Sequence, residues 1–96
     1  MICVIANVQV LPGKGGEFEG LIREVKAQVQ ANEPGNLLYQ MTRSQTEPNS
    51  YKGIEIYRDQ AAFDLHAQAD YFLAALPKLG PLLAGEPHVE FLDPVD

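Results

Sequence analysis

The chain has 96 residues, of which 46% are apolar and 21% charged, an ordinary balance for one globular domain spanning residues 1–96. Its formal net charge is −6 and its 7 basic residues form no cluster, which disfavours binding to nucleic acid and to anionic membranes. The single cysteine, Cys3, excludes an intrachain disulfide and a structural zinc site built on cysteines.

The N-terminal third predicts a strand followed by a helix. Residues 2–11 are rich in β-branched side chains and stop at Pro12-Gly13. Alternate positions of this strand form one wholly apolar face, made of Ile2, Val4, Ala6, Val8 and Val10. Residues 15–32 then carry apolar side chains at helical spacing, at Phe18, Leu21, Ile22, Val25 and Val29. Pro34 ends that helix.

The remaining elements complete a ferredoxin-like order. Residues 37–43 and 51–58 predict two strands of a hairpin, joined by the polar segment SQTEPNS. Residues 60–67 and 69–76 predict helix with a break near Asp70, residues 79–83 a loose turn or short helix, and residues 88–92 a last strand. The order β-α-β-β-α-β predicts an α+β fold, with helices covering one face of a four-stranded antiparallel sheet.

The other face of this sheet is predicted to be too apolar to stay in water. It would carry Cys3, Ile5, Leu11, Leu38, Gly53 and Tyr57. A second copy of the chain is the simplest cover, so we expect a homodimer with the sheets packed face to face. A pocket would then lie between sheet and helices or near the dimer seam.

No apolar run is long enough to cross a bilayer. The N-terminus alternates like a strand and lacks the basic start of a signal peptide, so we expect a cytoplasmic protein. A metal site is not expected, because His66 and His88 are the only histidines and neither has a carboxylate pair at ligand spacing.

Four segments, in order and spacing, resemble the antibiotic biosynthesis monooxygenase family, whose members are dimeric α/β-barrel proteins. They are LPGKGGEF, EPGNLLYQM, IEIYRDQAAFDLH and YFLAALPKLGPLLAGEP. The resemblance implies a monooxygenase that needs no cofactor and oxidises a quinol or related aromatic molecule, whose anion reacts with O₂ directly. The alternatives are a non-oxidative isomerase or small-molecule-binding protein on the same fold, and a purely structural dimer.

Heme-degrading relatives use an Asn on the first strand, a Trp at the end of the third and a His on the following helix. The corresponding positions here are Asn7, Tyr57 and Leu76. Leu76 cannot ligate iron, so heme degradation is not expected.

Three residues are the candidates for catalysis. His66 could take a proton from a phenol, since its ordinary pKa is about 6.5. The alternative is a helix histidine bonded to backbone. Asn7, poorly suited to mid-strand, could bond a substrate oxygen, or else Gln40 or Glu55 across the sheet. Tyr57 could bond or stack on the substrate ring, or only pack.

Three further residues are candidates for substrate binding. Glu55 shares a strand face with Tyr57 and would serve as a base if burial raised its pKa, whereas the alternative is an ion pair with Arg43 or Arg58. Tyr71 is expected near the pocket mouth. Phe72 would contact the substrate, although its spacing with Leu73 and Leu76 also suits the core.

Overall fold

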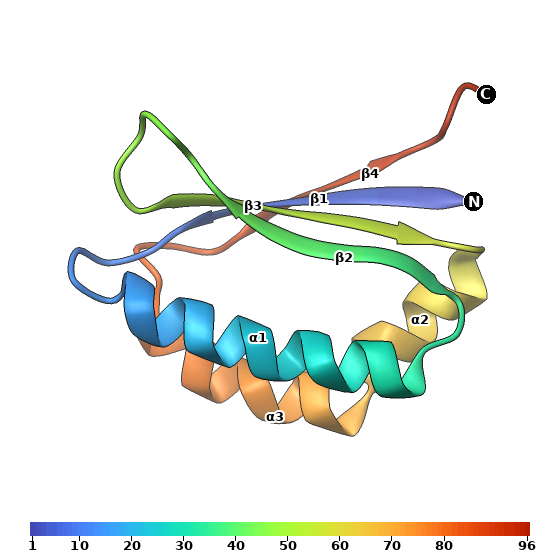
Figure 1. Cartoon of the computed structure of the whole chain (residues 1–96), viewed down its shortest axis with the longest axis horizontal. Helices are drawn as coiled ribbons and strands as arrows, with labels where there is room; N and C mark the ends of the chain where they lie inside the picture. Colours follow the sequence, from blue (N-terminus) through green and yellow to red (C-terminus); the bar gives the residue numbers. More distant parts are fainter.

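The computed structural model describes residues 1–96, and the predicted order of elements is confirmed (Figure 1). The strands are β1 (Ile2–Gln9), β2 (Asn36–Arg43), β3 (Ser50–Tyr57) and β4 (His88–Leu92). The helices are α1 (Gly15–Asn32), α2 (Gln60–Gln68), α3 (Asp70–Leu79) and the short 3₁₀ helix η1 (Gly80–Leu82). The strands form one antiparallel sheet in the order β2-β3-β1-β4, so the fold is the predicted ferredoxin-like α+β arrangement.

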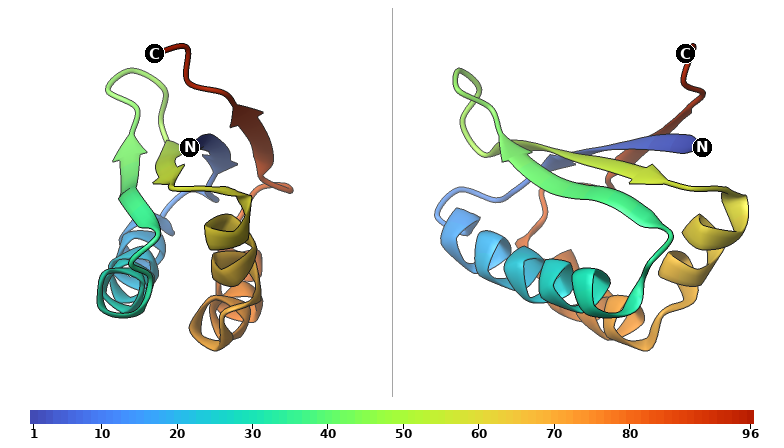
Figure 2. Two further views of the ribbon diagram at one scale, coloured as in Figure 1. Left: turned by 90° about the vertical axis from the view of Figure 1, so that its right-hand side faces the viewer. Right: turned by 45° about the vertical axis from the view of Figure 1, so that its right-hand side comes forward.

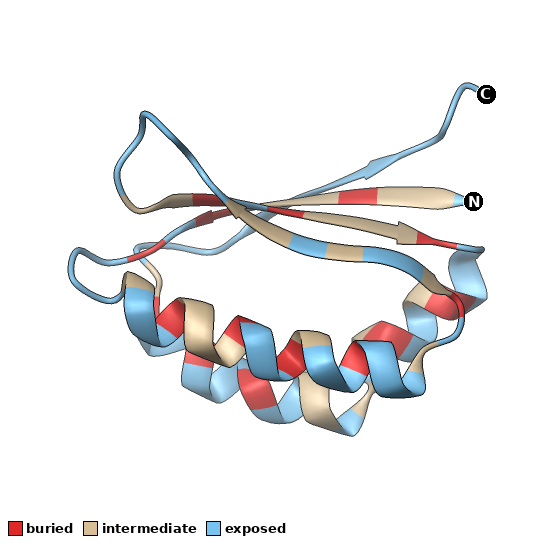
Figure 3. Ribbon diagram, in the orientation of Figure 1, coloured by how far each residue is buried: buried red, intermediate tan, exposed pale blue.

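All the helices lie on one face of the sheet, and the opposite face is uncovered (Figure 2). The buried residues gather between these two layers (Figure 3). Helix α1 contributes the predicted apolar stripe, with Phe18, Ile22, Val25 and Val29 buried, and β1 contributes Val4 and Val8. The apolar faces of both elements were therefore readable from their periodicity.

The strand register decides which side chains face the helices. Residues directly opposite in an antiparallel pair share a face, and β3 places Tyr57 opposite Ile2 and Glu55 opposite Val4. Tyr57 and Glu55 therefore lie on the helix-covered face. The prediction that Tyr57 and Gly53 lie on the uncovered face is wrong, because both alternating sets of β3 contain large apolar side chains and the sequence does not fix their phase.

The helical segment after β3 breaks close to the predicted point, near Asp70, but it buries other residues than expected. Ala69 has extended backbone and separates α2 from α3, one residue before the predicted break. Helix α3 then continues through Pro77, whose fixed φ suits a helix although one hydrogen bond is lost. Leu73 and Leu76, predicted as core, are 48% and 45% exposed, and the helix instead buries Ala75 and Leu79 against the α1 stripe.

The structure contains no helix with the length and apolar character needed to cross a membrane.

Candidate active site

Helix α2 carries His66 into the interior of the molecule. The helix begins at the N-cap Asp59, whose Oδ1 accepts a hydrogen bond of 2.9 Å from the Ala62 N–H. His66 lies in its last turn, beside the kink at Ala69, and is 3% exposed. The predicted backbone partner is absent from its ring, which bonds a side chain instead.

That partner is Glu33, the C-cap residue of α1, which the sequence analysis did not single out. His66 Nδ1 lies 3.0 Å from Glu33 Oε2, and both side chains are almost completely buried. The Tyr71 hydroxyl donates to the same oxygen. Because a carboxylate only accepts, this contact favours the neutral tautomer with its proton on Nδ1 and leaves Nε2 with a free lone pair.

Nε2 of His66 is open to the cavity described below. It makes no hydrogen bond within the protein. Only one side-chain polar atom is both fully buried and without a partner, and that atom is Glu33 Oε1. Nε2 is therefore not fully buried, and His66 lines the cavity. A neutral imidazole held in this way can take a proton from a bound molecule.

Glu55 and Tyr57 form a second polar pair on the same side of the sheet. The Tyr57 hydroxyl donates a hydrogen bond of 2.6 Å to Glu55 Oε1. Burial raises the pKa of the Glu55 carboxyl above its ordinary value, and the Tyr57 hydrogen bond only partly opposes this. The predicted ion pair of Glu55 is absent, because Arg43 binds Glu19 and Arg58 lies beside Asp59.

Aromatic rings surround the imidazole of His66. Its centroid lies 4.6 Å from that of Phe72, 5.4 Å from that of Tyr39 and 5.7 Å from that of Tyr57. Burial raises the pKa of the Tyr39, Tyr57 and Tyr71 hydroxyls, so all three are protonated near neutrality. The His66 ring is thus packed by ring faces and edges that suit an aromatic ligand.

A cavity of about 330 Å³ lies between the sheet and the helices beside His66. Of its 18 lining residues 14 are hydrophobic, and its polar members include Glu55 and His66. Leu76 and Val89 line it and are 45% and 43% exposed, so the cavity reaches solvent between α3 and β4. An apolar chamber with a few convergent polar groups is the usual form of a small-molecule site.

The predicted site residues are only partly brought together. Phe72 lines the cavity. Tyr57 and Tyr71 do not line it, but they donate hydrogen bonds to Glu55 and Glu33 respectively. Asn7 does not join them, because its register with Lys52 places it on the uncovered face. There its Oδ1 accepts from Lys52 Nζ at 2.8 Å and its Nδ2 donates to the His88 carbonyl at 3.3 Å, so the predicted bonds to Gln40 or Glu55 are wrong.

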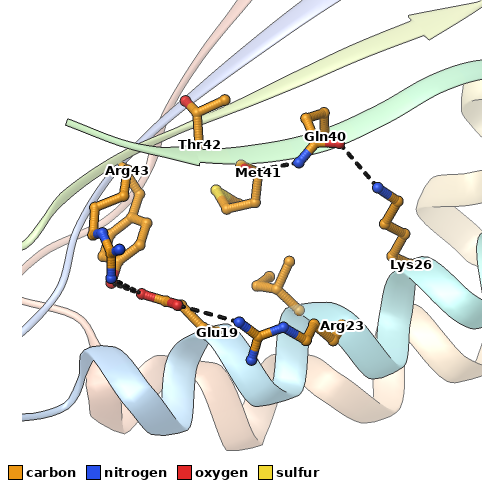
Figure 4. A pocket seen from close by; sticks show the side chains of 9 residues that line it. Glu19, Arg23, Lys26, Gln40, Met41, Thr42 and Arg43 are labelled. Carbon is orange, nitrogen blue, oxygen red and sulfur yellow. Dashed lines mark hydrogen bonds and ion pairs between the residues drawn. The ribbon is translucent and has the colours of Figure 1, made fainter. Parts of the chain in front are cut away.

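A charged surface pocket of about 360 Å³ lies apart from this cavity, between α1 and β2 (Figure 4). Glu19 at its floor accepts hydrogen bonds from Tyr51 at 2.6 Å and Arg43 at 2.9 Å, and pairs with Arg23. The Tyr51 hydrogen bond, more than the arginines, lowers the pKa of Glu19. These mutually paired groups fasten α1 to the sheet.

The structure contains no group of three or more His, Cys, Asp or Glu side chains placed to hold a metal ion.

Topology and cavity together define a ferredoxin-like α+β domain with an apolar cavity between its sheet and its helices. Residues 1–78 match the family model described as antibiotic biosynthesis monooxygenase, and the chain belongs to this family.

Solved structures agree with this assignment. A Caulobacter crescentus CB15 protein that carries the family's name is 46% identical, with a TM-score of 0.96 over 99% of this chain and 90% of that one. A conserved protein of Methanosarcina mazei Go1 is 26% identical, with a TM-score of 0.89 over 95% of this chain and 89% of that one.

An uncharacterized protein of Synechocystis sp. strain PCC 6803 is 36% identical over 83 residues. These cover 86% of this chain and 56% of that protein, so the chain spans little more than half of that relative's length.

Proposed function

We propose that the protein is a cofactor-independent monooxygenase that oxidises a quinol or related aromatic molecule with O₂ in the cavity beside His66. The observation that carries the proposal is the fixed histidine: Glu33 holds Nδ1 at 3.0 Å, and Nε2 is open to an aromatic, apolar chamber. Membership of the family and the name of the Caulobacter protein support it.

The chemistry asks for a base and an apolar binding site. His66 Nε2 removes a proton from the substrate, and the resulting anion is electron-rich enough to reduce O₂ and form a bond from a ring carbon to one oxygen atom. When a ring CH₂ becomes C=O, one atom of O₂ enters the product, and the other leaves with the two hydrogens as water. The Tyr39 hydroxyl, which makes no hydrogen bond in the chain, is free to donate to the substrate oxyanion.

The lining of the cavity separates this proposal from its main alternative. A sugar-like substrate of an isomerase would need many hydrogen-bonding partners, whereas 14 of the 18 lining residues are hydrophobic. Such a chamber favours a flat aromatic molecule. A protein that binds this molecule without turning it over is the other outcome that an assay must distinguish.

We also propose that residues 1–96 act as one domain that pairs through the uncovered sheet face. That face presents a run of apolar side chains from all four strands: Cys3, Ile5, Leu38, Ile54, Ile56 and Leu92. A second copy would remove them from water and form the dimeric barrel of the family. The cytoplasmic location stays a prediction.

Oxygen uptake tests the proposed activity. A panel of quinols and anthrone is mixed with the protein in air and under argon, and ¹⁸O₂ then shows the origin of the product oxygen. The proposal predicts turnover only in air, with one ¹⁸O atom in the product. Turnover that continues under argon would instead support the isomerase, and ligand-dependent stabilisation without any turnover would support the binding protein.

A further inference from the structure

We propose that Glu33 passes protons between His66 and water in a separate surface pocket, while Tyr71 holds the Glu33 carboxylate in place. This inference rests on the proposed function, because it describes how the base of that reaction is reset.

The contacts place Glu33 as the only polar link behind the histidine. Its Oε2 faces His66 Nδ1 at 3.0 Å and also accepts the Tyr71 hydroxyl. Its Oε1 is buried without any partner in the chain. A buried carboxylate oxygen without a donor is costly, so such an atom calls for a ligand or a water molecule.

Two distinct pockets meet at this link. The substrate cavity is lined by His66 but not by Glu33 or Tyr71. A second pocket of about 480 Å³, between the α1–β2 turn and α2, is lined by Glu33 and Tyr71 but not by His66. Among its other walls are the polar side chains Asn32, Arg58, Asp59 and Asp70, together with small apolar residues of α2. The histidine therefore faces the substrate cavity directly, and Glu33 links it to a second pocket that carries four further polar side chains.

A substrate that fills the apolar cavity shuts the histidine off from water there. The imidazole can then stay neutral on gaining the substrate proton only if its Nδ1 proton leaves on the other side of the ring. The substrate O–H or C–H bond breaks as a new N–H bond forms at His66 Nε2. The Nδ1 proton moves to Glu33 Oε2, and the Glu33 O–H then gives a proton to water in the second pocket. Nε2 gains one proton, Nδ1 loses one, and Glu33 gains one and then loses it to water. The imidazole therefore stays neutral as its other tautomer.

The return path closes the cycle. The Nε2–H now faces the cavity and protonates the oxygen that leaves as water. Water in the second pocket returns a proton to Glu33, and Glu33 returns one to Nδ1. No proton is gained or lost over the turnover. Tyr71 does not carry the proton, because burial and the Glu33 hydrogen bond raise the pKa of its hydroxyl.

Titratable and charged groups face the Glu33 carboxylate from two sides. Tyr39 and Glu55 feel the charge of Glu33 from the sheet side, where it raises the pKa of each. Arg58, Asp59 and Asp70 line the solvent side. No arginine or lysine bonds the carboxylate directly, which would have fixed it as an anion.

The test uses anthrone as probe and compares Glu33→Gln with Glu24→Gln, an exposed glutamate of the same helix. One readout is kcat in air, and the other is exchange of the anthrone CH₂ hydrogens with D₂O under argon. We expect Glu33→Gln to lower both by about 100-fold while its KM for anthrone and its melting temperature stay close to wild type. Glu24→Gln should match wild type. Unchanged rates and an unchanged pH profile in Glu33→Gln would overturn the relay.

A rescue experiment guards against a misfolded variant. Glu33→Ala opens the position toward the second pocket, so added formate should restore exchange in proportion to its concentration. Absence of rescue in a variant whose circular dichroism matches wild type would also overturn the relay. Wild-type exchange without O₂ uptake would contradict the oxygenase while leaving the relay measurable. A wild type that does neither contradicts both.

Discussion

Glu33 Oε2 lies 3.0 Å from His66 Nδ1 and thereby joins the end of α1 to the last turn of α2 beneath the sheet. The two residues are 33 positions apart, and their side chains are almost fully buried. The candidate base is therefore held by the junction of two helices, and its chemistry depends on how those helices are packed.

Tyr57→Phe should destabilise the protein, because it leaves a buried carboxylate oxygen of Glu55 without its donor at 2.6 Å. We expect the free energy of unfolding to fall by about 1–3 kcal/mol, measured by urea titration. Tyr39→Phe is the matched control, since its hydroxyl has no hydrogen-bond partner in the chain, and its loss should stay within about 0.5 kcal/mol. Equal losses in the two variants would speak against the Glu55–Tyr57 bond.

Glu55→Gln should change how stability depends on pH. Burial raises the pKa of Glu55 in the folded chain above its ordinary value of 4.5, so the folded state binds the proton more tightly than the unfolded state. This contribution to stability is fully present below the unfolded pKa and is lost as the pH rises through the folded pKa.

Thermal unfolding of wild type and of Glu55→Gln is compared between pH 4 and pH 8. The difference between their melting temperatures isolates the contribution of this carboxyl group. The melting temperature of the variant, relative to that of wild type, is expected to increase as the pH rises from the ordinary carboxyl value. A constant difference across the range, or one that shrinks, is incompatible with a raised pKa at Glu55. Glu24→Gln, on the exposed side of α1, should show no such trend.

Gly35→Ala should disturb the packing of α2 against the turn that precedes β2. A Cβ at this position would come within 2.6 Å of the Ala62 Cβ, and a short side chain fixed to a helix cannot move aside. We expect a loss of about 1–3 kcal/mol in the free energy of unfolding, with reduced activity because α2 carries His66. Gly20→Ala on α1 has open space around it and should instead stabilise by about 0.5–1 kcal/mol. Similar effects of both substitutions would contradict this packing.

Ile54→Lys should weaken the proposed homodimer. Ile54 lies opposite Ile5 on the uncovered face, and a charge there would be buried without a partner between two sheets. Analytical ultracentrifugation should show a dimer for wild type, a monomer for this variant and a dimer for Gln28→Lys on α1. A wild-type protein that sediments as a monomer rules out pairing through the sheets.

The sequence sufficed for the parts of the fold that rest on local periodicity. The α1 stripe of Phe18, Ile22, Val25 and Val29 and the apolar face of β1 followed from spacing alone. The face of Tyr57 did not, because both alternating sets of β3 contain large apolar side chains and only pairing with β1 sets their phase.

The candidate site was harder to predict for the same kind of reason. Glu33 stands in a polar turn where a solvated side chain is the ordinary expectation, and only the packing of α2 against the end of α1 buries it. Asn7 looked like a pocket residue because it sits among apolar neighbours, but its partner in the register is Lys52 on the opposite face. Its proposed contact with substrate has no support in the cavity of one chain.

The most direct test of the central claim is the kcat of His66→Ala for O₂ uptake with the best substrate of the quinol panel. If His66 Nε2 is the base, kcat should fall by at least about 100-fold, whereas Lys26→Ala, which removes only a surface hydrogen bond from α1 to Gln40, should match wild type. A folded His66→Ala protein that consumes O₂ at the wild-type rate would contradict the account.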